Sequence, residues 1–166
     1  RMLLMKWFPF SLLLLLGCFL SGCKEENVLT LGAAAPELGA LTLNDQPVSL
    51  KTWQGKYVYL VFWSDSCGGC FSEMPHLQAL SQQYQHDLVV VGVNTDANAD
   101  RIKSIQNQMG LTFPMVRDQL GISSERYKLP GTPAAYLIDR EGRLLSQSIG
   151  FQKPAELDQQ FKQLIP

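Results

Sequence analysis

The chain has 166 residues, of which 46% are hydrophobic and 17% are charged. At roughly 100–200 residues per domain, this length allows one globular domain with a short appendage, and the composition excludes a disordered or collagen-like chain. Fourteen Lys and Arg against fifteen Asp and Glu give a net charge of −1; because no basic run matches a phosphate backbone, we expect no nucleic-acid partner.

The first 22 residues have the pattern of a secretory signal peptide. Positive charge at Arg1 and Lys6 precedes an almost wholly apolar stretch, residues 7–20. The stretch ends in Leu20-Ser21-Gly22-Cys23, which resembles the bacterial lipoprotein box, in which the cysteine is lipidated and becomes the mature N-terminus. We therefore expect residues 1–22 to be a signal peptide and Cys23 to carry a lipid that anchors the chain to a bacterial membrane.

An uncleaved transmembrane anchor is the alternative, because residues 3–23 are nearly as long as the roughly 20 residues that a bilayer requires. Either interpretation places the rest of the chain outside the cytoplasm, where disulfides persist. Cys18 leaves with a signal peptide and Cys23 is used by the lipid, so one cysteine pair remains for the domain.

The segment 23–35 has little that could pack, and we predict it to be a linker between the membrane and a domain at 36–166. Turn-forming residues at 44–47 lie between apolar residues, which predicts a β-hairpin at a sheet edge. Further along, apolar runs predict strands at 57–63, 88–93, 134–138 and 144–149. Apolar residues at helical spacing predict helices from Phe71, before Gly110 and from Pro154. This order predicts an α/β fold with a central mixed sheet.

A Cys67-Gly68-Gly69-Cys70 pair follows the first long strand and opens the first helix. Unpaired N–H groups and the helix dipole favour a thiolate at that position. We therefore predict a lowered pKa for the Cys67 thiol, which makes Cys67 the nucleophile. Cys70 lies one turn further along, from where it can attack a mixed disulfide and release the reduced partner.

Other uses of the pair are a zinc site, a haem attachment and a structural disulfide. Zinc requires four ligands, and only His76 and His86 remain to supply them. A c-type haem requires His directly after the second cysteine, where this chain has Phe71. A structural disulfide that closes so short a loop contributes little entropy. We therefore predict a redox role, with no metal and no cofactor.

Three segments in order resemble the thioredoxin superfamily, specifically its membrane-tethered TlpA/ResA-like thiol-disulfide oxidoreductases. They are the redox segment 62–70, the helix start 71–75 and the segment 131–139, and the resemblance extends over about residues 35–165. It implies a thioredoxin-like fold in which residues 95–127 form an extra helical insertion. The chain departs from the family at Ser66, where Trp is usual, and at Gly69, where Pro is frequent.

The resemblance also implies roles for residues outside the cysteine pair. Glu73 corresponds to a buried glutamate that tunes or accepts the cysteine protons, a role that burial suits by raising its pKa; a glutamate favoured by the helix dipole is the alternative. Thr132 and Pro133 correspond to a cis-proline loop whose exposed backbone pairs with an extended substrate, whereas sequence alone favours an ordinary trans proline.

Together these features predict an extracytoplasmic protein-disulfide reductase whose substrates are disulfides of exported proteins, apocytochrome c among them. We expect a monomer that receives electrons from a membrane donor or another thiol-disulfide partner. Two alternatives remain open. One is a peroxiredoxin-like thiol peroxidase, but this chain carries only half of that motif, because Leu60 and Ser64 occupy its proline and threonine positions. The other is a non-enzymatic tethered lipoprotein in which the disulfide is structural.

Overall fold

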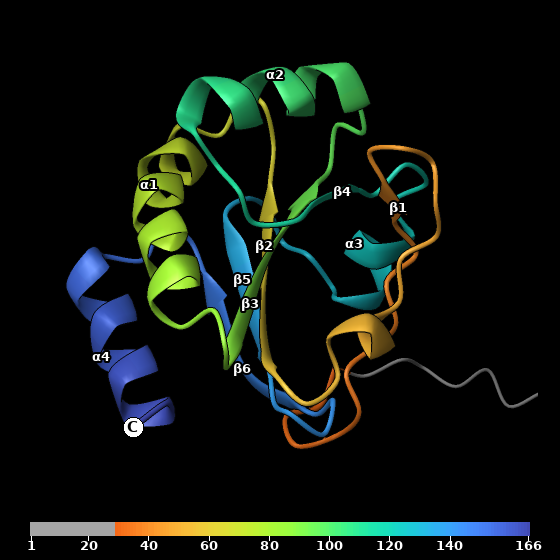
Figure 1. Ribbon diagram of the computed structural model, residues 1–166. Coiled ribbons are helices and arrows are strands. Elements are labelled where there is room, and N and C mark those ends of the chain that lie inside the picture. Colours follow the sequence, from red (N-terminus) through yellow and green to blue (C-terminus); the bar gives the residue numbers. More distant parts are fainter. Residues whose placement is uncertain (1–28) are drawn as a thin grey trace, which may run out of the picture.

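The computed structural model describes residues 29–166, which form a central sheet covered by helices (Figure 1). The sheet has the strand order β1-β4-β3-β2-β5-β6. Strands β2, β3 and β4 are parallel to one another, and β1, β5 and β6 pair antiparallel with their neighbours. The strands are β1 (Leu41–Thr42), β2 (Tyr57–Trp63), β3 (Leu88–Asn94), β4 (Met115–Arg117), β5 (Ala134–Ile138) and β6 (Leu144–Ile149). This is the thioredoxin-like α/β fold that the sequence predicts.

Helices cover both faces of the sheet, which explains why β2 and β3 are almost continuously apolar. The helices are η1 (Leu50–Trp53), α1 (Gly68–Gln83), α2 (Ala99–Met109), α3 (Ile122–Arg126) and α4 (Pro154–Leu164). Buried side chains of α1, α2 and α4 pack with one face of the sheet in a single core cluster. A second cluster, on the other face, joins the sheet to Tyr127, directly after α3, and to Leu38 and Ala40.

The predicted strands and helices form where the apolar pattern places them. Strands β2, β3, β5 and β6 match the predicted segments to within one residue, and α2 ends at Gly110, which adopts a left-handed conformation with φ of 65°. Helix α4 begins at Pro154 and buries Leu157 and Phe161. Helix α1 contains Pro75, and its buried residues include Met74 and Leu77.

The predicted hairpin is present in a reduced form. Thr42 N–H donates to Gln46 O at 2.8 Å, so the turn at 44–47 is formed. Its second arm is short: Leu41 forms an antiparallel bridge with Pro47, and Val48 N–H donates to Ala40 O at 3.1 Å. Only β1 becomes a strand of the sheet, where it also pairs with β4, and Leu50 begins the 3₁₀ helix η1. Within the predicted insertion the chain adds β4 and α3, neither of which the apolar pattern predicts individually.

The predicted linker extends too far toward the C-terminus. Gly32 N–H donates to Leu144 O at 2.7 Å, Leu144 N–H donates to Ala33 O at 2.9 Å, and Ala34 forms an antiparallel bridge with Arg143. Residues 32–35 therefore belong to the domain, because their backbone groups pair with the start of β6 although their small side chains contribute little packing. Cys23 and the predicted signal peptide lie outside the described residues, and within 29–166 no helix has the length and apolar character needed to span a membrane.

Candidate active site

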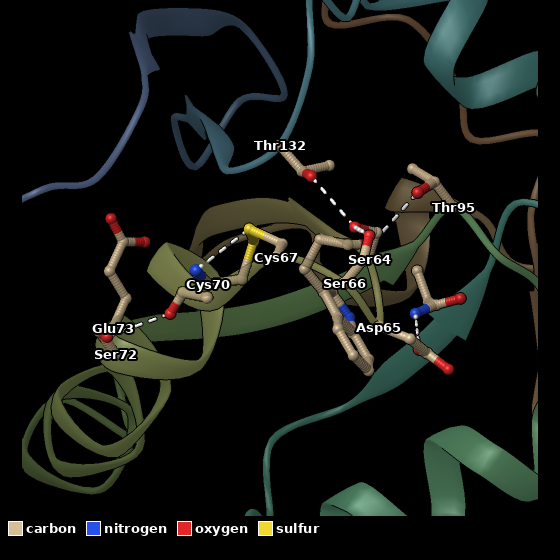
Figure 2. The surroundings of a disulfide bond; sticks show 12 residues. Ser64, Asp65, Ser66, Cys67, Cys70, Ser72, Glu73, Thr95 and Thr132 are labelled. Atoms are coloured by element: carbon tan, nitrogen blue, oxygen red, sulfur yellow. Dashed lines mark hydrogen bonds between the residues drawn. A yellow bond between two sulfur atoms is a disulfide. The ribbon is translucent and has the colours of Figure 1, made fainter.

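The cysteine pair lies where β2 ends and α1 begins. Cys67 is the N-cap of α1, and its Sγ accepts a hydrogen bond from Cys70 N–H at 3.1 Å. The two residues form a disulfide with a Cα–Cα distance of 5.3 Å (Figure 2). Cys67 is 8% exposed and Cys70 is 1% exposed. An incoming sulfur can therefore reach Cys67 more readily than Cys70.

The N-cap position gives Cys67 the electrostatic environment of a nucleophile. The first N–H groups of a helix have no partner within the helix, and they carry the positive end of its dipole. In the disulfide form, the Cys70 N–H is directed at the Cys67 sulfur. A hydrogen bond to the charged form of an acid lowers its pKa, so this geometry favours a Cys67 thiolate.

Glu73 is buried on α1, one turn after Cys70. Its side chain is 4% exposed, and its carboxylate accepts a hydrogen bond from the backbone N–H of Gln152. Burial raises the pKa of Glu73 above its ordinary value, and the Gln152 N–H opposes part of that rise. Residues three apart on a helix are neighbours on one face, so Glu73 lies on the same side of α1 as Cys70. A buried carboxyl with a raised pKa beside a buried thiol is suited to accepting its proton.

The loop before β5 lies against the cysteine pair. The peptide bond between Thr132 and Pro133 is cis, as the family resemblance implies. The Pro133 Cδ atom lies 3.6 Å from the position that a side-chain carbon on Gly69 would occupy. The hydroxyls of Thr132 and Ser64 lie 3.3 Å apart, which links this loop to the end of β2 (Figure 2). The structure therefore brings Thr132, Pro133 and the cysteine pair together.

A polar network on the other side of Cys67 is not apparent in the sequence. Asn94, fully buried at the end of β3, donates from Nδ2 to Asp65 Oδ1 at 3.2 Å. Its Oδ1 accepts from Asp96 N–H at 2.9 Å and from Ala97 N–H at 2.8 Å. Asn94 thus joins the segment before Cys67 to the loop after β3. The two segments are 29 residues apart, so no local pattern could have revealed the contact.

The two histidines lie away from the cysteine pair's chemistry. His76 Nε2 is 2.8 Å from Asp158 Oδ1, so this pair joins α1 to α4 at the surface. Among residues 29–166, no three His, Cys, Asp or Glu side chains are grouped in a way that could hold a metal ion. The side chains that surround the cysteines are those of a thiol-disulfide exchange site.

A redox cysteine pair at the start of α1, a cis-proline loop against it and a buried glutamate one turn further along the helix define a thioredoxin-like thiol-disulfide oxidoreductase. The profile of the AhpC/TSA family matches residues 31–147, and the chain belongs to this family. It is similar to thiol-disulfide oxidoreductase ResA of Bacillus thuringiensis, at 29% identity over 86% of this chain and 83% of that protein. It is equally similar, at 29% identity over 95% of this chain and 97% of that protein, to thioredoxin-like protein YneN of Bacillus subtilis.

The fold is also shared with solved structures. One from Chlorobium tepidum, assigned provisionally as thiol:disulfide interchange protein DsbE, superimposes with a TM-score of 0.75 and 31% identity over 84% of this chain and all of that one. The chain is thus an enzyme of the ResA/DsbE type, and its substrates are protein thiols and disulfides. This outcome confirms the resemblance to the TlpA/ResA-like oxidoreductases that the sequence motifs indicate.

Proposed function

We propose that this protein is an extracytoplasmic disulfide reductase, anchored by a lipid on Cys23, that donates electrons to disulfides of exported proteins. The observation that carries the proposal is the asymmetric cysteine pair: Cys67, at the helix N-terminus, is 8% exposed, whereas Cys70, one turn before the buried Glu73, is 1% exposed. Apocytochrome c is the substrate class that the family resemblance supports. A membrane protein or another thiol-disulfide partner would return the electrons to the pair.

In the reaction, the Cys67 thiolate attacks one sulfur of the substrate disulfide. A mixed disulfide forms, and the second substrate sulfur leaves as a thiolate that takes a proton from water. Cys70 then loses its proton to Glu73 and attacks the Cys67 sulfur, and the first substrate sulfur leaves as a thiolate that also takes a proton from water. The substrate gains two electrons and two protons, and the Cys67–Cys70 disulfide seen in the structure is the product.

Thr132 and Pro133 are the proposed substrate-binding residues. The paired part of β5 begins at Ala134, so Thr132 lies before it, in the loop beside the cysteines. An extended substrate segment can therefore pair with this backbone while its sulfur reaches Cys67. The hydroxyl contact between Thr132 and Ser64 supports a fixed position for this loop.

The direction of electron flow is tested by the reduction potential of the full-length protein, equilibrated with glutathione. We expect a value below about −230 mV, as for a donor, because a charged Glu73 opposes the Cys67 thiolate and so disfavours the strongly oxidising extreme. Insulin reduction measured beside peroxide consumption supplies the control, with reduction of insulin expected and little loss of peroxide. A potential near about −120 mV contradicts a donor role, and rapid peroxide consumption favours the thiol peroxidase.

The lipid anchor is tested on the protein extracted from membranes. Because Leu20-Ser21-Gly22-Cys23 follows a charged and then apolar stretch, we expect the intact mass to show a chain that begins at a lipid-modified Cys23. Cys23→Ser is expected to lose this form, whereas Cys18→Ser, in the same stretch, retains it. An unmodified Cys23, or a retained N-terminal segment, contradicts the anchor.

A further inference from the structure

A large apolar side chain lies exposed beside the cysteine pair and is not used by the mechanism above. Phe151 is 46% exposed. Its Cβ atom lies 3.7 Å from the position that a side chain on Gly69 would occupy, and the Pro133 ring lies at a similar distance from the same point. Gly69, which is half-buried and lies two residues along the chain from Cys67, and the exposed Phe151 thus lie side by side over the buried Pro133 ring, and we call this apolar surface the apolar ledge.

The loop that carries Phe151 is held on both sides by elements of the active site. Gly150 N–H donates to the carbonyl of Pro133 at 2.8 Å. Gln152 N–H donates to the Glu73 carboxylate, and Gln152 Nε2 donates to Gly150 O at 3.3 Å. Isolated exposed apolar residues are common on protein surfaces, but this one is fixed between the cis-proline loop and the buried glutamate. Its exposure is therefore a defined feature of the site.

The reaction determines what covers the ledge. A substrate sulfur has to contact Cys67 Sγ, and an extended chain advances only about 3.3 Å per residue. The residues that directly flank the substrate cysteine must therefore pass over the surface around Cys67. The chain neighbours of Cys67 are Ser66 and Gly68, which are exposed and present no apolar side chain. Apolar contact with the substrate therefore comes from the ledge.

We propose that Phe151 is a specificity-determining residue, which favours substrates with an apolar side chain directly beside the reacting cysteine. The proposal rests on a mixed disulfide at Cys67, which forms in the proposed function whichever way the electrons flow. Contact with the substrate side chain buries apolar area on both partners, and this gain is made only when the flanking residue is apolar. Selection then occurs at the mixed disulfide, where enzyme and substrate are joined.

The test uses the full-length protein in detergent and two peptides, each with one disulfide, that differ only in Leu or Ser on both sides of the reacting cysteine. The rate constant kcat/KM is measured for reduction of each peptide by the reduced enzyme. It is also measured for oxidation of each dithiol peptide by the oxidised enzyme. We expect a Leu-over-Ser preference of about fivefold for the wild type, as for burial of about half of an aromatic side chain.

Phe151→Ser is expected to lower this preference to less than twofold, and Phe151→Leu to retain most of it. Leu31→Ser is the matched control, because Leu31 is 60% exposed but lies beside Gly32, whose backbone pairs with the start of β6; its preference should equal that of the wild type. A wild type without the preference, or a Phe151→Ser variant that retains it, overturns the proposal. Oxidation without reduction contradicts the proposed direction, and the oxidation rates then still decide the role of Phe151.

Discussion

Replacing Cys67 by Ser is expected to abolish thiol-disulfide exchange, and replacing Cys70 by Ser to stop the reaction at a mixed disulfide. Cys67 is the accessible sulfur at the helix N-terminus, so its loss removes the nucleophile and reduces the rate to background, a decrease of about 10³-fold or more. The Cys70→Ser variant still attacks, but it cannot release the substrate. Non-reducing gels and mass spectrometry of the two variants, incubated with insulin, measure the trapped species.

The control is the variant in which both Cys67 and Cys70 are replaced by Ser, which should form no mixed disulfide with insulin. A reducing agent should release the substrate from Cys70→Ser. Mixed disulfides on Cys67→Ser, together with none on Cys70→Ser, would reverse the two roles. Alkylation of the reduced wild type provides an independent measurement, in which Cys67 should react first because it is the more exposed cysteine and lies at the helix N-terminus.

Replacing Glu73 by Gln is expected to slow release of the substrate by about 10²-fold, the usual contribution of a positioned base. Cys70 is 1% exposed, so its proton has no direct route to water, whereas Glu73 lies on the same face of α1. Only the ionised carboxylate can accept the proton. In the wild type the release rate should therefore fall as the pH falls through the raised pKa of Glu73. In stopped-flow measurements between pH 5 and 9, the release rate of the Glu73→Gln variant should not show this fall.

The fold should tolerate this change. Gln keeps an oxygen that can accept the Gln152 N–H. Because burial raises the pKa of Glu73 in the folded state, ionisation costs the wild type stability as the pH rises from the ordinary glutamate value to the raised one. The variant has no such loss, so its melting temperature at pH 7 should not be lower than that of the wild type. Glu156→Gln, at an exposed helix start, is the matched control; equal release rates in all three proteins would limit Glu73 to a structural role.

Local pattern predicts most of the sheet, because β2 and β3 are buried on both faces and carry long apolar runs. It does not predict β4, which has only three residues, follows Pro114 and becomes a strand through its pairing with β3 and β1. Helix α3 has five residues and a Gly N-cap without a side-chain bond. The backbone N–H groups of Ser123 and Ser124 donate instead to Asp118, at 2.9 and 2.8 Å. Such contacts depend on the folded chain, and periodicity does not encode them.

The active site, like the fold, has parts that local sequence predicts and parts that depend on the folded chain. The spacing of Cys67 and Cys70 at a strand-helix junction predicts the redox pair from the sequence. The family resemblance adds Glu73 and the loop at Pro133. Phe151 lies far along the chain from the cysteines, and its place beside Gly69 results from the sheet order, which brings the end of β6 next to β5 and so close to α1. No sequence motif marks a contact of this kind.

The pairing of residues 32–34 with Arg143 and Leu144 fixes the end of the sheet at which the described chain joins the domain. Val58, near the start of β2, pairs with Ile138, whereas Cys67 follows the far end of the same strand. The seven residues of β2, at about 3.3 Å each, therefore separate the point where the chain enters the domain from the sulfurs (Figure 1). A lipid on Cys23, as proposed above, would therefore tether the domain at the end of the sheet opposite to the sulfurs. The cysteine pair would then be free to meet molecules that arrive from solution.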